Sequence, residues 1–224
     1  MVNWQPLILT FQLAALTTLL LLFIGTPIAY WLAHSRSRIK PVLEALISMP
    51  LVLPPTVLGF YLLIAFSPSG AFGQWLDEQL GLQLVFSFPG IVLGSMIYSL
   101  PFMVYPIQAG FARLSPSLRE AAYVLGKSRR TTFFKVLLPN VKASLLSAIV
   151  LTFAHTIGEF GVVLMIGGNI PGQTKVASIA IYDEVESLQY GAAHTYSLVL
   201  FAITFAILLI VYWVNGRHVK SWER

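Results

Sequence analysis

Two ionisable residues deep in an apolar stretch are the first candidates for chemistry. His155 and Glu159 lie four residues apart in TFAHTIGEFGVVLMIGGNIPG, a spacing that predicts one shared helix face. Ionisable groups inside membrane spans are functional candidates, and one hypothesis for this pair is a proton relay. A relay normally needs more groups than two. We therefore favour the alternative that Glu159 lies toward the outer end of its helix, while His155 donates a hydrogen bond to a neighbouring span.

Residues beside this pair could either pack helices together or contact a substrate. Thr152, Thr156 and Gly161 are small or hydroxylated, and such residues allow close contact between membrane helices. Asn169 follows in the glycine-rich segment 167–172, which could present backbone N–H groups as an anion-binding nest or form an ordinary tight loop. The candidates for a translocation path or gate are Thr152, Thr156, Glu159, Gly161 and Asn169.

Enzymatic chemistry finds no support in the sequence. No paired-carboxylate site, HExxH, GxSxG or phosphate-binding GxxxxGK[ST] motif occurs. The chain has no cysteine, which excludes disulfides, Cys-ligated metals and thiol catalysis. We therefore expect no catalytic residue, no metal and no cofactor, and classify the chain as a non-enzyme.

Composition places the elements that would position these residues in a membrane. Hydrophobic residues make up 57% of the chain and charged residues 10%, with a mean hydropathy of +0.78. A soluble domain carries about 25% charged residues. The sequence pI of about 9.6 does not indicate nucleic-acid binding, because that function needs a basic face on a soluble fold. An all-α integral membrane protein surrounded by lipid is predicted.

Five apolar stretches each exceed the roughly 20 residues that cross a bilayer. They cover residues 7–33, 42–66, 88–111, 140–166 and 192–214. The second contains Pro50, Pro54 and Pro55, and the third contains Pro101 and Pro106. Proline frees backbone carbonyls that lipid cannot satisfy, so the second span should line the bundle interior or the pathway.

The basic residues predict the orientation. Thirteen of the fourteen Lys and Arg residues fall on one side of these five spans, and only Lys175 falls on the other. The positive-inside rule then predicts a plasma-membrane protein with its N-terminus outside and its C-terminus in the cytoplasm. Residues 67–87 and 167–191 are then predicted to lie on the outer side of the membrane. Lys175 could attract an anion there, although a single exposed lysine is usually just solvated.

The longest cytoplasmic segment is predicted to form two short helices, over residues 116–138. Ser115 is a suitable N-cap with Pro116 at the first helical position, and Gly126 can adopt the positive φ that ends a helix. Ser128 can cap a second helix, which Pro139 would interrupt. One apolar stripe is expected on the first helix, made of Leu118, Ala121, Ala122 and Leu125.

The sequence pattern of this segment resembles a known family signature. The segment is similar to the pattern EAA-x3-G-x9-I-x-L-P of permease subunits of bacterial ABC importers. It has Glu120-Ala121-Ala122, then Gly126 after three residues, then Val136-Leu137-Leu138-Pro139 after nine, with Val136 in place of Ile. The resemblance implies a type I importer architecture, with residues 1–224 as one transmembrane permease domain. It also implies that the helix docks on a cytoplasmic ATPase, which hydrolyses the ATP. The residues assigned to coupling are Glu120, Ala121, Ala122, Gly126, Leu138 and Pro139.

A second stretch narrows the resemblance. Residues 158–172, GEFGVVLMIGGNIPG, with the continuation to Asp183, resemble the molybdate branch of these permeases. This implies import of molybdate and also tungstate, fed by a periplasmic or lipid-anchored binding protein. Five spans without an internal repeat are too few to enclose a translocation path, so a homodimer bound to two ATPases is expected. The alternatives are a permease for another oxyanion such as sulfate, or a proton-coupled secondary transporter, which should show inverted repeats.

Overall fold

Helices and short connections make up the whole of residues 3–219, the part of the chain that the computed structural model describes. The helices are α1 (Gln5–His34), α2 (Lys40–Val52), α3 (Pro55–Phe66), α4 (Ala71–Leu80), α5 (Phe88–Ala112), α6 (Pro116–Val124), α7 (Arg129–Thr132), the π-helix η1 (Phe133–Leu137), α8 (Leu138–Asn140), α9 (Lys142–Ile157), α10 (Gly161–Gly167), α11 (Ala177–Glu186) and α12 (Tyr190–Val219). No strand occurs in that range. The predicted all-α class is confirmed.

Three straight helices and two bent pairs account for the predicted spans. α1, α5 and α12 are each long and apolar enough to cross a bilayer, as expected from residues 7–33, 88–111 and 192–214. α2 and α3 meet at 115°, and the segment Arg129–Asn140 meets α9 at 72°. Counting each bent pair as one span gives five crossings.

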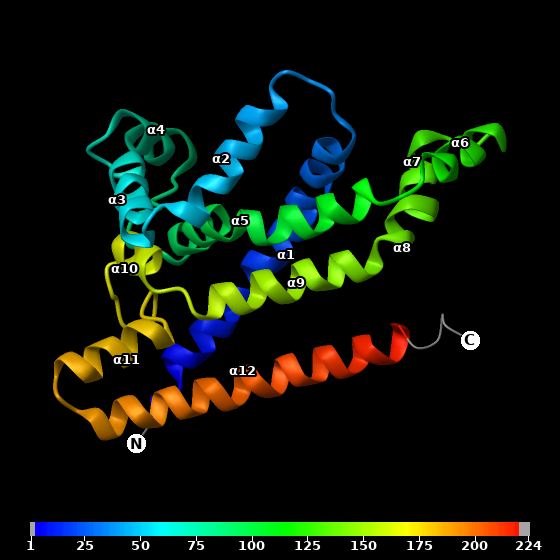
Figure 1. Ribbon diagram of the computed structural model, residues 1–224. Helices are drawn as coiled ribbons and strands as arrows, with labels where there is room; N and C mark the ends of the chain where they lie inside the picture. Colours follow the sequence, from blue (N-terminus) through cyan, green and yellow to red (C-terminus); the bar gives the residue numbers. More distant parts are fainter. Residues whose placement is uncertain (1–2, 220–224) are drawn as a thin grey trace.

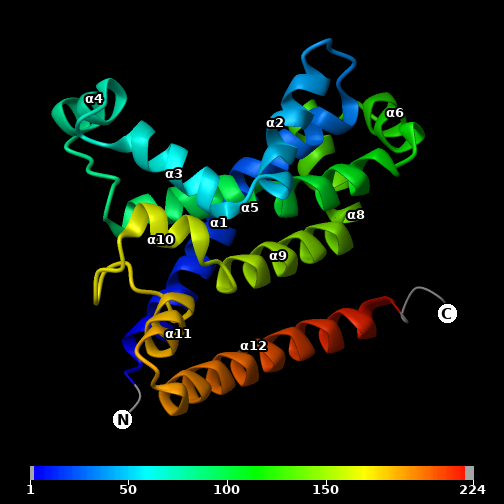
Figure 2. The ribbon, with the colours of Figure 1, turned by 60° about the vertical axis from the view of Figure 1, so that its left-hand side comes forward.

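The two ends of the bundle differ in what they carry. α6, α7 and α8 lie at one end, and α4, α10 and α11 lie at the opposite end in both views (Figures 1 and 2). α1 connects the two ends: near its start the Tyr196 hydroxyl donates to the Asn3 carbonyl at 3.0 Å. Near its other end, the rings of Tyr30 and Phe133 lie 5.0 Å apart. The segment 116–138 is thus at the opposite end from the start of the described chain.

The main core lies where α1, α5 and α9 pack together. Its buried residues include Leu21 and Leu32 from α1, Met103 and Ile107 from α5, and Ala148 from α9. By contrast, α12 is buried over only 6% of its most apolar window, which lies within Tyr190–Trp213. The last crossing therefore contacts the rest of the chain mainly near its start, where Tyr196 packs in a small cluster with Ala177 of α11.

The second span is broken by proline as predicted, but its expected burial is not seen in a single chain. Only Ile47, Pro50 and Gly59 are buried in α2 and α3. α2 ends at Val52, which is 82% exposed, and α3 begins at Pro55, so the break falls at the predicted prolines. The outer face of this bent pair remains exposed and apolar, so that one chain alone does not enclose it.

The fourth span is not the single helix predicted over residues 140–166. α9 ends at Ile157, the next residues leave the helical path at Phe160 (φ −130°, ψ −59°), and α10 begins at Gly161. α10 then packs against α3 instead of continuing the direction of α9 (Figure 2). A tertiary contact with a segment a hundred residues earlier therefore ends the helix.

Candidate functional site

The first helix of the signature segment begins and ends at the predicted residues. Ser115 is the N-cap of α6, and its side chain accepts a hydrogen bond from the Ser117 N–H at 3.4 Å. At the other end Gly126 has φ +70°. The Lys127 N–H donates to the Ala122 carbonyl at 3.0 Å across this glycine, the bond of a Schellman C-cap. Both ends of the helix are thus fixed by local chemistry.

The surface of α6 differs from the single stripe that was expected. Ala122 alone is buried, whereas Leu118 and Tyr123 are exposed. Val124 is 87% exposed and Leu125 is 73% exposed. The helix therefore turns one small residue toward its own chain and presents large apolar side chains outward, a surface of the kind that a partner protein covers.

The second half of the signature segment packs on α1. Ser128 caps α7 by accepting from the Thr131 N–H at 3.2 Å, as predicted. The interruption expected at Pro139 comes just after it: the helical segment Arg129–Asn140 includes Pro139, and the chain bends by 72° between Asn140 and Lys142. The π-helix η1 directly before this proline moves the backbone hydrogen bonds to partners five residues back, with the Leu138 N–H donating to the Phe133 carbonyl. Phe133 packs against Phe111 of α5, with ring centroids 6.0 Å apart.

The six residues assigned to coupling are thus placed on one short unit but not on one face. Glu120, Ala121, Gly126 and Pro139 are exposed, Leu138 is half-buried and Ala122 is buried. The unit comprises α6, α7, η1 and α8.

A buried polar cluster joins α5 and α9 at the second candidate site. The Ser99 hydroxyl lies 2.9 Å from Nδ1 of His155 and 3.1 Å from the Thr156 hydroxyl. Thr156 also donates to the Thr152 carbonyl at 2.9 Å, and the His155 ring stacks on Phe102 at 4.0 Å. The hydrogen bond predicted between His155 and a neighbouring span is therefore present. Thr152 and Thr156 are both buried in this contact between helices.

Glu159 lies outside this cluster. α9 ends before it, so the predicted sharing of one helix face with His155 is wrong. The Glu159 side chain is 4% exposed, and neither carboxylate oxygen meets hydrogen-bond geometry with any described residue, although Ser95 of α5 lies beside it. Its carbonyl accepts from the Ser178 hydroxyl at 2.6 Å. Within the described chain, no hydrogen bond links the two residues into a relay.

Gly161 occupies a position of close helix packing. A Cβ there would lie 2.9 Å from Cβ of Pro55 and 3.1 Å from the backbone nitrogen of Thr56. Gly59 makes the reciprocal contact, because its Cβ would lie 2.8 Å from Cβ of Met165. The two glycines allow the starts of α3 and α10 to approach more closely than side chains permit.

The segment 167–172 is built as a tight loop. The Ile170 N–H donates to the Thr174 hydroxyl at 2.9 Å, and the Ile170 carbonyl accepts from the N–H groups of residues 173–175. Asn169, at φ +57°, donates its side-chain amide to both oxygens of Asp183 at 3.1 and 3.0 Å. These bonds direct the polar groups of the loop toward its own chain, which favours the tight loop over an anion nest.

Lys175 is not merely solvated. Its Nζ lies 2.5 Å from Oδ2 of Asp183, so one carboxylate on α11 holds both Lys175 and Asn169. The three side chains tie the loop that follows α10 to α11.

We expect Lys175→Ala to change uptake only modestly and to leave the fold intact. The ion pair is partly exposed, with side-chain exposures of 26% and 27%, and exposed pairs contribute about 0–1 kcal/mol. Asn169 still satisfies Asp183 in the variant. Uptake assays and thermal unfolding of the two proteins check this. A complete loss of uptake with an unchanged unfolding temperature would contradict it and assign Lys175 to a partner contact.

Sequence reasoning missed Glu44, a carboxylate within the second span. Its Oε1 accepts from the Gln108 side-chain amide at 2.8 Å, and its carbonyl accepts from the Tyr105 hydroxyl at 2.9 Å. Lys40 lies 3.8 Å from the same carboxylate. The i,i+4 spacing of Lys40 and Glu44 was the signal that could have found it. Glu44 fixes α2 to α5.

Among the described residues, no three His, Asp or Glu side chains gather to hold a metal ion.

Comparison with known proteins identifies the family. Residues 25–224 match the family described as "Binding-protein-dependent transport system inner membrane component". The molybdenum transport system permease protein ModB of Azotobacter vinelandii is 48% identical over 214 residues, which cover 95% of this chain and 93% of that protein. The sulfate transport system permease protein CysT of Escherichia coli K12 is 34% identical over 193 residues, covering 86% and 69%.

A solved structure shows the same fold. It is the bacterial alginate ABC transporter in complex with the alginate pentasaccharide-bound periplasmic protein. One chain of that structure superposes on this chain with a TM-score of 0.78 and 18% sequence identity. The superposition covers 96% of this chain and 79% of that one. At this identity the likeness concerns the fold alone. By its family match and its identity to ModB over nearly its full length, the chain belongs to the binding-protein-dependent inner membrane components and is a ModB-like, multi-pass ABC importer permease.

Proposed function

We propose that this chain is the translocation subunit of an ATP-driven importer of molybdate, and also of tungstate. The observation that carries the proposal is α6: a family coupling signature that forms a capped helix with exposed apolar side chains at one end of the bundle. The substrate is supported by the identity to ModB.

The unit of α6 to α8, which contains the predicted coupling segment 116–138, would dock on a cytoplasmic ATPase subunit. A helix seats in a groove when small residues permit close approach and apolar anchors fill the groove. Ala121 offers the small exposed residue, Val124 and Leu125 offer the anchors, and Glu120 offers a charge for a basic partner. Gly126 fixes the end of the helix, while Leu138 and Pro139 connect the unit to α9. ATP hydrolysis then belongs to the partner, and the chain itself is no enzyme.

A homodimer would complete the path. In one chain of this single permease domain, residues 1–224, the exposed apolar face of α2 and α3 includes Phe60 and Tyr61. Free carbonyls at a proline break must be satisfied by protein or water, so this face fits a path on a two-fold axis better than it fits lipid. Two copies would also present two α6 helices to two ATPase subunits.

The path would hold its anion weakly. Residues 41–112 and 143–174 contain no Lys or Arg, so a tetrahedral dianion meets hydroxyls and backbone dipoles and no paired positive charge. Glu159, at the break between α9 and α10, would repel an anion and is assigned to packing or gating. Thr152 and Thr156 face α5, so their contribution to the path requires movement of that helix contact. Selectivity would then reside in a separate periplasmic or lipid-anchored binding protein.

Reconstitution tests this function. The permease is co-expressed with its ATPase, purified and placed in proteoliposomes with loaded binding protein. We expect the binding protein to stimulate ATP hydrolysis and molybdate to enter only with ATP. Preferential uptake of sulfate would favour the sulfate alternative, which the similarity to CysT keeps open. Uptake on a proton gradient without ATP would instead establish a secondary transporter.

Impermeant thiol reagents test the orientation, with the N-terminus outside and the C-terminus inside. The native chain lacks cysteine, so one introduced thiol gives one signal. We expect Lys127→Cys to react only from the cytoplasmic side, and Asp77→Cys or Glu184→Cys only from outside. The three positions lie at opposite ends of the bundle, in the turn after α6, in α4 and in α11. Labelling of all three from one side would overturn the orientation. Lys220, also predicted inside, lies outside the described residues.

A further inference from the structure

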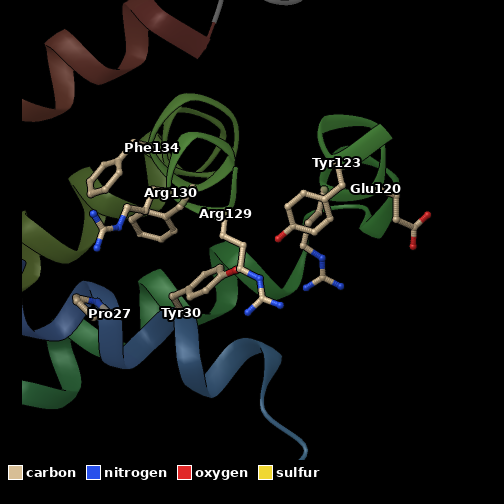
Figure 3. A pocket seen from close by; sticks show the side chains of 9 residues that line it. Pro27, Tyr30, Glu120, Tyr123, Arg129, Arg130 and Phe134 are labelled. Atoms are coloured by element: carbon tan, nitrogen blue, oxygen red, sulfur yellow. The ribbon is translucent and has the colours of Figure 1, made fainter. Parts of the chain in front are cut away.

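A cavity lies between α1 and the α6–α8 unit, beside the contact of Tyr30 with Phe133. Its volume is about 720 Å³, within the range of roughly 300–1,000 Å³ found for ligand sites. It lies at the end of the bundle that carries the coupling signature (Figure 3). Its lining residues are Pro27, Tyr30, Arg119, Glu120, Tyr123, Arg129, Arg130, Phe133 and Phe134.

The cavity carries a positive charge that the chain does not neutralise. Arg119, Arg129 and Arg130 contribute three guanidinium groups, and within residues 3–219 no carboxylate lies within 4 Å of any of them. Glu120 is the one acidic lining residue, and its carboxylate points away from Arg129 and Arg130 (Figure 3). Guanidinium groups bind phosphate oxygens bidentately, so the arrangement suits a phosphate group.

Aromatic residues place this charge at the level of lipid headgroups. Tyr30 and Phe134 line the cavity beside the arginines (Figure 3). Tyr30 belongs to α1, a candidate membrane span, and Phe134 is exposed. Tyrosine and similar rings concentrate where a span leaves the hydrocarbon, and basic pockets on the cytoplasmic side of helix bundles bind anionic headgroups.

An apolar stripe on α1 leads from the cavity toward the middle of the span. Leu16, Leu19 and Phe23 are exposed and follow one another at helical spacing, and Phe23 is 70% exposed. The stripe ends at Pro27, which lines the cavity. A molecule with an anionic head and a hydrocarbon tail would match both features at once.

We propose that the cavity binds the phosphate of an anionic phospholipid through the guanidinium groups of Arg129 and Arg130, with an acyl chain along the exposed stripe of α1. The lipid would brace the α6–α8 unit against α1. Acidic residues of a partner protein are the less favoured occupant, because Pro27 and Tyr30 of a membrane span form one wall of the cavity. This proposal rests on the proposed ATPase partner and on the cytoplasmic placement of the α6–α8 unit, but its test needs no transport.

Native mass spectrometry of the purified permease–ATPase complex measures the binding. Phosphatidylglycerol is added in parallel with phosphatidylcholine of the same chain length. We expect selective retention of phosphatidylglycerol, reduced about tenfold in Arg129→Ala/Arg130→Ala, because two charge-assisted hydrogen-bonding groups are lost. The matched control is Arg36→Ala/Arg38→Ala, which removes two basic residues just beyond α1 and should retain the lipid as the wild type does. Arg129→Lys/Arg130→Lys should give an intermediate loss, since it keeps the charge and removes the planar fork.

Each contrary result has a distinct meaning. Equal retention of the two lipids, or equal losses in the cavity and control variants, would show only general charge attraction and overturn the site. Displacement of phosphatidylglycerol by an equal concentration of inorganic phosphate would make it a free-anion site and overturn the lipid assignment. If the cavity variant retained the lipid but lost the ATPase, the arginines would belong to the contact with the ATPase, and the lipid site would be wrong. Wild-type thermal unfolding of both alanine variants is the check on folding, and among the residues that the structure describes neither Arg129 nor Arg130 forms an ion pair whose loss would unfold the chain.

Discussion

Gly126→Val is expected to abolish coupling between ATP hydrolysis and transport while leaving membrane insertion intact. Gly126 has φ +70°, a conformation that costs a side-chain-bearing residue about 1–3 kcal/mol, and most for a β-branched one. The end of α6 must then change, with loss of the bond from the Lys127 N–H to the Ala122 carbonyl. Because Val124 and Leu125 sit on that last turn, the docking surface changes with it. Binding-protein-stimulated ATPase activity is the measurement.

Gly81→Val provides the matched control for this experiment. Gly81 follows α4 at the other end of the bundle, with φ +61° and, like Gly126, with nothing within 4 Å of an added Cβ. The same chemical change therefore creates the same local strain away from the proposed interface. Gly126→Asn is a second control, because asparagine tolerates positive φ, and should keep much of the activity. Wild-type stimulation in Gly126→Val would exclude docking through this end of α6.

Gly161→Ala is expected to destabilise the permease and, through that loss, to reduce uptake. The added Cβ would press against Pro55 and the backbone of Thr56, and backbone cannot move aside as a flexible side chain can. Overpacking of this kind costs about 1–3 kcal/mol, which corresponds to a fall in Tm of roughly 2–12 °C for a chain of this size. Thermal unfolding of the detergent-purified protein checks the value.

Gly158→Ala separates packing from other effects of losing a glycine. It lies three residues earlier, and its added Cβ would be 3.8 Å and 3.9 Å from the nearest atoms, which is ordinary contact. We expect its Tm to match that of the wild type. If Gly161→Ala instead kept its Tm but lost uptake, Gly161 would contact the translocated anion and the packing assignment would be wrong.

The features that sequence could predict are those decided by neighbouring residues. Ser115, Gly126 and Ser128 act through hydrogen bonds and backbone angles within a few residues of themselves, and each is found in its expected role. The break at Pro54 and Pro55 is likewise a local effect, since proline lacks the N–H that a helix needs. The end of the segment Arg129–Asn140 one residue after Pro139 is local in the same way.

The features that escaped prediction depend on residues far apart in the chain. Nothing local ends α9 at Ile157, because single glycines are common in membrane helices. The turn forms because α10 packs on α3, and Gly161 meets Pro55 across about a hundred residues of sequence. Burial of Glu159 follows from the same turn. The partners of Lys175 were also missed for this reason, since Asp183 reaches it only once α11 has folded back.

The contact between α3 and α10 also constrains how the protein is made. α3 has 12 residues, about 18 Å of helix, and cannot cross a hydrocarbon core of about 30 Å by itself. α12, in contrast, is apolar enough to enter the bilayer without a protein partner. During synthesis α3 is made about a hundred residues before α10. Until α10 has been made, α3 therefore lacks the helix that packs against it. Truncated chains that end before Gly161 and are released from the ribosome should therefore expose α3 to proteases, and released chains that extend past Gly167 should protect it.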